Sequence, residues 1–138
     1  MTTGVPAGVT VKSRRRTSLW TRMHPFETAW PIDHGSFVGR AVKEGVILPG
    51  RSIQIGIRTH APDDCGIEIL FGEDLETLGI GGVVERVRAR TVGAKAYITF
   101  DIDCLDPAFA PGTGTPVAGG PSSREALMIL RRLGALEI

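Results

Sequence analysis

The chain has 138 residues, 42% of them apolar, which is the length and apolar content of a single soluble domain. Sixteen basic and fifteen acidic side chains leave a net charge of +1, and this balance argues against nucleic acid and against a membrane surface as partners. No window approaches the roughly 18 apolar residues of a membrane-spanning helix, and Cys65 and Cys104 are too far apart in sequence to form a metal-binding or redox motif. We therefore expect a reduced, cytoplasmic protein.

Residues 1–30 differ in composition from the rest of the chain. Glu27 is their only acidic residue, whereas five residues are basic: Lys12, Arg14, Arg15, Arg16 and Arg22. Such a segment is compatible with a mitochondrial transit peptide, with a disordered basic leader, and with a twin-arginine export signal that lacks its apolar stretch. We expect a boundary near residue 30, with residues 31–138 forming the folded domain.

Two elements are predicted in the first half of this domain. Residues 37–44 have apolar side chains at positions 37, 38, 41 and 42, which predicts a short amphipathic helix that ends at Gly45. After a turn at 46–50, residues 52–57 are rich in β-branched side chains and predict a buried strand.

Three further elements are predicted after a weakly patterned stretch. Valines at 83, 84, 87 and 92 fit a helix over residues 82–91, with Gly93 as its cap. Residues 96–100 (Ala-Tyr-Ile-Thr-Phe) predict a central strand that leads directly into Asp101. Ser122 or Ser123 is expected to cap a last helix. The apolar face of that helix is predicted to comprise Leu127, Met128, Leu130 and Leu133.

The alternation of helices and strands predicts an α/β fold with a layered sheet. In such folds ligands bind beyond the carboxyl ends of the parallel strands, which is where Asp101 and Asp103 are expected to lie. Residues two apart in an extended chain point to the same face, so both carboxylates are expected to converge while Ile102 faces the apolar side.

Three carboxylates in six residues, Asp101, Asp103 and Asp106, would repel one another unless a cation held them together. Oxygen ligands suit hard divalent ions such as Mg²⁺ or Mn²⁺. The Asp106-Pro107 pair is expected to turn the chain away from the strand. An Asp-x-Asp pair alone also fits solvated acids at the end of a strand, or a mononuclear Mg²⁺ or Ca²⁺ site, and both alternatives remain open at this point.

The residues around these acids form a long and specific string. Phe-Asp-Ile-Asp-Cys-Leu-Asp-Pro at 100–107 continues through Ala-Phe-Ala-Pro-Gly-Thr-Gly-Thr-Pro to Pro116, with Gly-Gly at 119–120. This string resembles the agmatinase signature of the ureohydrolase, or arginase, family, and the likeness extends upstream through residues 52–59 to His-Gly-Ser-Phe at 34–37. The resemblance implies a three-layer α/β/α fold with a mainly parallel sheet, of which this chain would hold a truncated part.

The resemblance also implies a chemistry and assigns roles to three residues. Family members use a binuclear manganese centre with a bridging hydroxide that attacks the guanidinium carbon of agmatine, releasing urea and putrescine for polyamine biosynthesis. Asp101 matches the bridging carboxylate, Asp103 a second metal ligand, and His34 a histidine that assists proton transfer. Ser36 replaces the threonine that usually follows this histidine. No substrate-binding residue is assigned, and enzymes acting on guanidinobutyrate, guanidinopropionate or proclavaminate are close alternatives.

Other ligands of the family are absent from this sequence. Neither a Gly-Gly-Asp-His nor an Asp-Ala-His-x-Asp segment occurs, nor does the acidic segment that follows the last helix in the family. Two carboxylates cannot hold two metal ions, so the chain alone is expected to bind manganese poorly and to have little or no activity. The alternative to an enzyme is thus an inactive fragment or a non-catalytic metal-binding remnant.

The missing metal motif has a candidate origin in the reading frame. Trp20 to His24, read from the third base of the Trp20 codon, can encode Asp-Ala-His-Ala if Arg22 uses a CGN codon. We hypothesise that the residues before about Thr28 are an out-of-frame translation.

A truncated sheet would also leave strand edges open beside residues 52–57 and 96–100, which predicts self-association. The family is homo-oligomeric.

Two further features lie near the predicted site. The glycines in Gly112-Thr-Gly-Thr115 would allow close backbone approach in a loop that walls the active site. The absence of a following Lys-Ser/Thr excludes a P-loop. Arg58, at the end of the first predicted strand, is expected either to shape the site or to form a surface ion pair.

Overall fold

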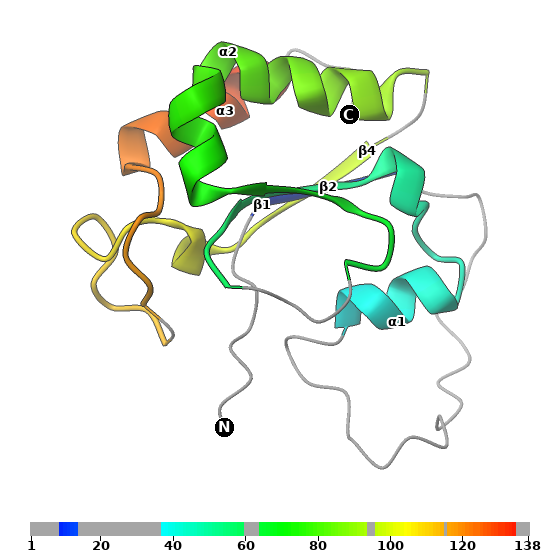
Figure 1. Cartoon of the computed structure of the whole chain (residues 1–138), viewed down its shortest axis with the longest axis horizontal. Helices are drawn as coiled ribbons and strands as arrows, with labels where there is room; N and C mark the ends of the chain where they lie inside the picture. The colour runs from blue at the N-terminus through cyan, green and yellow to red at the C-terminus, as the bar shows by residue number, and fades with distance from the viewer. Residues whose placement is uncertain (1–8, 14–36, 60–63, 94–95, 115, 135–138) are drawn as a thin grey trace.

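A computed structural model describes most of the chain, in five segments: residues 9–13, 37–59, 64–93, 96–114 and 116–134. Its centre is a four-stranded sheet, with α2 and α3 on one face and α1 on the other (Figure 1). The described part therefore has the three layers of an α/β/α fold, as the sequence predicts.

The strands of the sheet lie in the order β3-β2-β1-β4. They are β1 (Val9–Ser13), β2 (Ile53–Ile57), β3 (Glu68–Phe71) and β4 (Ala96–Phe100). β2 and β3 are parallel, whereas β1 is antiparallel to both β2 and β4, so β2, β3 and β4 all run in one direction. The sheet is thus mainly parallel, as expected, with β1 as the exception.

β1 occupies the position between β2 and β4 and comes from the segment 1–30. It pairs with both neighbours, from Val9 opposite Ile55 and Phe100 onward. The expectation of open edges beside β2 and β4 is therefore wrong on the sides that face β1. The other residues of the basic segment, apart from 9–13, lie outside the described residues.

β2 forms the centre of the main hydrophobic core. All five of its residues are buried, because the sheet is covered on both faces, and this explains why its sequence is a nearly continuous apolar run. Ile53 and Ile55 pack in one cluster with Val83 and Val87 of α2. The strand begins one residue later than the sequence predicts, at Ile53.

α2 (Gly72–Thr91) is longer than the helix expected at 82–91. Gly79 has φ 60° and ψ 174°, which interrupts the helix, and the core residues Val83, Val84 and Val87 all follow this kink. The prediction therefore located the buried half of α2 and missed its first half, together with β3. Gly93, at φ +68°, lies just beyond the end of the helix, as predicted.

α3 (Ser123–Leu133) packs on α2 and closes the core. Ser122 is its N-cap: the Ser122 hydroxyl accepts a hydrogen bond from the Glu125 N–H, and the Glu125 carboxylate accepts one from the Ser122 N–H. The predicted apolar face was partly wrong. Leu127 is 51% exposed, whereas the buried residues of α3 are Ala126, Ile129 and Leu133.

α1 (Phe37–Lys43) lies on the opposite face of the sheet and ends before Gly45, whose φ of +68° favours glycine. Val38 of this helix packs with Ile47 and Ile67 in a second, smaller apolar cluster. A 3₁₀ turn at Pro49–Arg51 then leads into β2. The predicted helix at 37–44 and its end at Gly45 are therefore confirmed.

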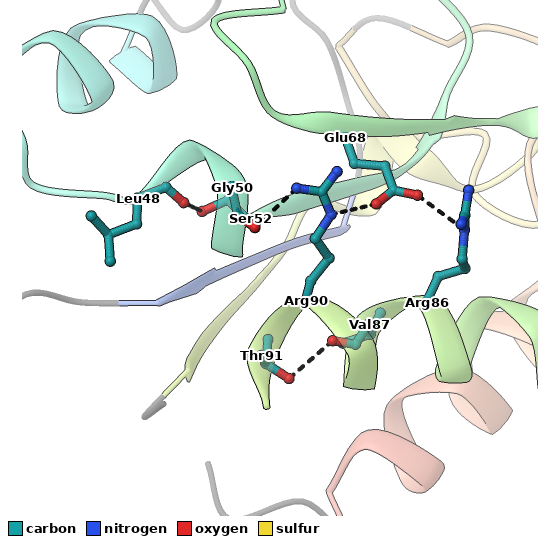
Figure 2. A network of polar contacts seen from close by, with 8 residues as sticks. All are labelled: Leu48, Gly50, Ser52, Glu68, Arg86, Val87, Arg90 and Thr91. Atoms are coloured by element: carbon teal, nitrogen blue, oxygen red, sulfur yellow. Dashed lines mark hydrogen bonds and ion pairs between the residues drawn. The ribbon is translucent and has the colours of Figure 1, made fainter. Parts of the chain in front are cut away.

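An ion-pair network ties α2 to the amino ends of β2 and β3 (Figure 2). Glu68, the first residue of β3, lies between Arg86 and Arg90 of α2, and its side chain is only 15% exposed. Arg90 donates one hydrogen bond to the Glu68 carboxylate and another to the Gly50 carbonyl, at 3.0 Å. The network therefore fixes the second half of α2 over the edge opposite to the one that carries Asp101.

Candidate active site

The acids at the carboxyl end of β4 lie in a tight turn. β4 ends at Phe100, and Asp101 is the N-cap of a 3₁₀ turn, Ile102–Cys104. The Asp101 Oδ1 atom accepts a hydrogen bond from the Asp103 N–H at 3.1 Å. The expected extended conformation is therefore wrong, and Ile102 is 50% exposed instead of facing the apolar side.

Asp101 and Asp103 are both half-buried, at the edge of the sheet that the carboxyl ends of β2, β3 and β4 share. The two residues lie close together in this turn, where the Asp101 carboxylate accepts a hydrogen bond from the Asp103 amide. The structure thus places the two predicted metal ligands together at the predicted edge of the sheet. His34, the predicted catalytic residue, lies outside the described residues.

Arg58, directly after β2, contacts main-chain oxygens on two sides of this turn. Its guanidinium donates to the carbonyls of Asp103 and Cys104, the latter at 2.8 Å, and to the Val117 carbonyl at 3.0 and 3.2 Å. Of the two expected roles, shaping the site is the one that these contacts support. Sequence reasoning could name Arg58 only from its place at the end of a strand.

Asp106 has a structural role in the loop that follows. Its two carboxylate oxygens accept hydrogen bonds from the N–H groups of Ala108, at 2.9 Å, and Gly119, at 2.8 Å. These hydrogen bonds hold the pKa of the Asp106 carboxyl below its usual value, and the bond from Ala108 has the largest effect. Because both oxygens are engaged within the loop, the structure disfavours a mononuclear metal site that includes Asp106. The predicted turn at Asp106-Pro107 is present, with Phe109 N–H donating to the Asp106 carbonyl.

The loop returns against the acidic turn at Gly120. A Cβ atom at this position would lie 2.4 Å from the Cys104 carbonyl oxygen and 2.7 Å from the Asp106 nitrogen. At Gly72, likewise, a Cβ atom would lie 2.3 Å from the Gly119 oxygen. The glycines that permit close approach are therefore these, whereas Gly112 and Gly114, which the sequence suggested, have open space around them.

Cys104, the last residue of the acidic turn, is fully buried. Burial raises the pKa of its thiol to about 11, although the nearby Arg58 guanidinium opposes the shift. The thiol is thus protonated at neutral pH, which argues against a nucleophilic role. In the described part of the chain, Cys65 and Cys104 form no disulfide.

The described residues alone do not fit a binuclear manganese centre. No group of three or more His, Cys, Asp or Glu side chains within the described ranges could hold a metal ion. Asp101 and Asp103 offer carboxylate oxygens of the kind that hard divalent ions prefer, but two carboxylates do not complete the ligand set of two ions. The described residues therefore leave the ligand set of such a site incomplete.

Comparison with known proteins places this geometry in a family. A model described as the arginase family matches residues 21–138. The chain belongs to the arginase family. An agmatinase of Chromobacterium violaceum is 44% identical over 115 residues, which cover 79% of this chain and 36% of the relative. The chain thus spans about a third of the length of the relatives it matches, and the family match begins ten residues before the boundary expected at residue 31.

Two solved structures extend the comparison to the fold. A hypothetical agmatinase of Burkholderia thailandensis has 51% identity and a TM-score of 0.73, covering 76% of this chain and 33% of its own. A proclavaminate amidino hydrolase of Streptomyces clavuligerus has 39% identity and a TM-score of 0.69, covering 75% and 37%. The arginase-family α/β fold that the resemblance implied is therefore confirmed.

Proposed function

We propose that this chain carries one wall of an agmatinase-type ureohydrolase site, which hydrolyses the guanidino group of agmatine to urea and putrescine. One observation carries the proposal: the acidic turn at 101–104 is packed under its return loop at the carboxyl edge of the sheet, within a region 44% identical to an agmatinase. Ligands of parallel α/β sheets bind at this edge. A small guanidino compound is accordingly the proposed substrate.

The proposed roles follow the sequence expectations. Asp101 and Asp103 are proposed as Mn²⁺ ligands, because their carboxylates are half-buried neighbours and Arg58 engages main-chain carbonyls beside them. His34 is proposed to assist proton transfer, since an imidazole can exchange a proton near neutral pH. Its place in the fold lies outside the described residues.

Urea release from agmatine in the presence of Mn²⁺ tests the enzymatic proposal. The wild-type chain is compared with Asp101→Asn and with a matched control, Glu76→Gln, whose carboxylate is exposed on α2 far along the chain from the acidic turn. We expect weak release by the wild type and the control and loss in Asp101→Asn. Equal release by all three proteins, or none by the wild type, would refute an enzymatic role for this chain by itself.

A guanidino acid is the second candidate substrate. The likeness to a proclavaminate amidino hydrolase, at 39% identity, favours it, because that name describes an enzyme whose substrate bears a carboxylate. Comparing kcat/KM for agmatine and for guanidinobutyrate separates the two classes. A higher value for guanidinobutyrate would assign the chain to the guanidino-acid enzymes.

A non-catalytic remnant is the third candidate, and the incomplete ligand set within the described residues favours it. This reading predicts metal binding, or partner binding, without urea release. The agmatine assay above decides against it if release depends on Asp101.

We further propose a reduced, cytoplasmic location and self-association. The near-neutral charge and the buried thiol of Cys104 support the first, and among the described helices none is long and apolar enough to cross a membrane.

Sedimentation of the full chain tests self-association, and a monomer at all concentrations would contradict it. Residues 1–30 remain proposed as a basic leader or an out-of-frame translation, of which residues 9–13 pair with the sheet as β1. The nucleotide sequence decides the latter, since a shifted frame without Asp-Ala-His would exclude it.

A further inference from the structure

Arg58 has a bonding pattern that distinguishes it from the other arginines of the described chain. Its Nη1 donates to the Gly56 carbonyl at 2.7 Å and to the Cys104 carbonyl at 2.8 Å. Its Nη2 donates to the Asp103 carbonyl, to the Val117 carbonyl at 3.0 Å, and more weakly to the Leu105 carbonyl at 3.5 Å. Its Nε donates to Val117 as well, at 3.2 Å.

These contacts use the complete donor set of the guanidinium, which has five N–H groups and no acceptor. Every partner is a main-chain carbonyl, and none is a carboxylate. No donor is left to bind the carboxylate of a substrate or of a neighbouring acid. This geometry therefore argues against direct recognition of a ligand by Arg58.

The end of β2 is shaped to place this guanidinium. The pairing of β2 with β3 is irregular between Ile55 and Ile57, and Gly56 has φ +77°. A glycine tolerates this conformation, which turns its carbonyl to Nη1 of Arg58. The arginine is thus anchored to its own strand before it reaches the other segments.

The other partners come from two segments that lie against each other. Asp103, Cys104 and Leu105 form the turn that begins at Asp101, and Val117 belongs to the loop that returns to Gly120. Removing Arg58 would take this donor from five buried or half-buried carbonyls, those of Gly56, Asp103, Cys104, Leu105 and Val117. The turn and the return loop would then separate locally while the core of β2, α2 and α3 stayed packed.

We propose that Arg58 is a positioning residue, which holds the backbone of the acidic turn against the return loop and thereby fixes the direction of the Asp101 and Asp103 carboxylates. We call the backbone contacts of Arg58 the clamp. The role of the two acids as metal ligands rests on the proposed function, whereas the clamp does not. Arg90, whose guanidinium joins Glu68 and the Gly50 carbonyl at the opposite edge, provides a matched arginine without contact to this turn.

The test measures the rate at which N-ethylmaleimide labels Cys104 in the full 138-residue chain, in a Cys65→Ser background. Cys104 belongs to the turn and is fully buried, so its labelling reports local opening. We expect Arg58→Met to raise the rate about tenfold over Arg90→Met, compared at denaturant concentrations that give both variants equal global stability. Equal rates in the two variants would overturn the proposal.

Lysine variants cover the case in which Arg58→Met does not fold. A lysine keeps the charge but, as a compact ammonium, cannot span both segments as the planar guanidinium does. We expect Arg58→Lys, but not Arg90→Lys, to raise the labelling rate and to shift the ¹³C carboxyl signals of Asp101 and Asp103, while the Asp64 signal stays unchanged. Unchanged signals with unchanged labelling would refute positioning. Neither readout requires metal or activity, so a failure of the proposed function in the urea assay remains distinguishable from a failure of the clamp.

Discussion

Arginines organise both edges of the sheet, but with different partners. At the amino edge, Arg86 and Arg90 neutralise the half-buried Glu68, and the network joins one helix to two strands (Figure 2). At the carboxyl edge, Arg58 binds carbonyls only and leaves the neighbouring carboxylates of Asp101 and Asp103 outside its own bonds. The first arrangement pairs opposite charges between a helix and the start of a strand, whereas the second holds the turn at 101–104 against the return loop. The two edges therefore use arginine differently: one joins carboxylates to cations, and the other joins backbone segments.

The largest expected effect is at the carboxyl edge, in Gly120→Ala. The new Cβ would meet backbone atoms of Cys104, Leu105 and Asp106, which cannot move aside as a flexible side chain can. We expect a loss of about 3 kcal/mol in the free energy of unfolding, measured by urea titration. Gly112→Ala, with open space at its Cβ, is the control and should change stability by less than about 0.5 kcal/mol. A similar small change in both would show that the return loop is loosely held.

At the amino edge, Glu68→Gln leaves two arginines without their anion. Because Glu68 is only 15% exposed, we expect a loss of about 1–2 kcal/mol, smaller at high salt than at low salt. The control Glu85→Gln removes an exposed partner of Arg88 and should cost less than about 0.5 kcal/mol. Thermal melts at two salt concentrations measure both. Urea release from agmatine that falls in Glu68→Gln beyond its loss of folded protein would contradict a purely structural role for this network.

The N-cap of α3 should contribute less to the free energy of unfolding than Gly120 or Glu68 does. Ser122→Ala removes the hydroxyl that accepts from the Glu125 N–H, and we expect a loss of about 1 kcal/mol. Ser123→Ala, one residue inside the helix, is the matched control and should be nearly neutral. Chemical denaturation of the two variants measures the difference, and an equal loss would mean that the cap lies elsewhere.

The smallest expected effect concerns pH. Hydrogen bonds from Ala108 and Gly119 lower the pKa of Asp106 in the folded chain, so its contribution to stability is present above the unfolded pKa and is lost as pH falls through the folded pKa. Stability should therefore decline below about pH 4, and less steeply in Asp106→Asn than in the wild type. Parallel slopes in acid would indicate that Asp106 does not hold the return loop.

The sequence predicted the elements whose patterns are local. Residues 96–100 are a strand as expected, because aromatic and β-branched residues dominate them, and Gly45 ends its helix as expected. The expected central position of this strand is wrong, because β4 is the last strand at one side of the described sheet and pairs only with β1. β3 was missed, since four residues carry too little periodicity, and so was the first half of α2, whose pattern the kink at Gly79 interrupts. Elements with such short or broken patterns depend on the fold around them.

The candidate site was predictable only in part, for a similar reason. The pair Asp101 and Asp103 was recognisable from its spacing and from the surrounding string. The role of Arg58 was not, because its partners at Cys104 and Val117 are remote in sequence and are carbonyls, which every residue has. Sequence likewise cannot indicate that Gly120, and not Gly112, meets the backbone of another segment.

The proposed manganese-dependent site would have one wall at the carboxyl edge, formed by Asp101 and Asp103. Electron paramagnetic resonance of free Mn²⁺, titrated with the full chain, tests it most directly. We expect weak, millimolar binding by the wild type, retained in Glu68→Gln and lost in both Asp101→Asn and Asp103→Asn. Binding that is unchanged in the two aspartate variants, or absent from the wild type at millimolar metal, would contradict it.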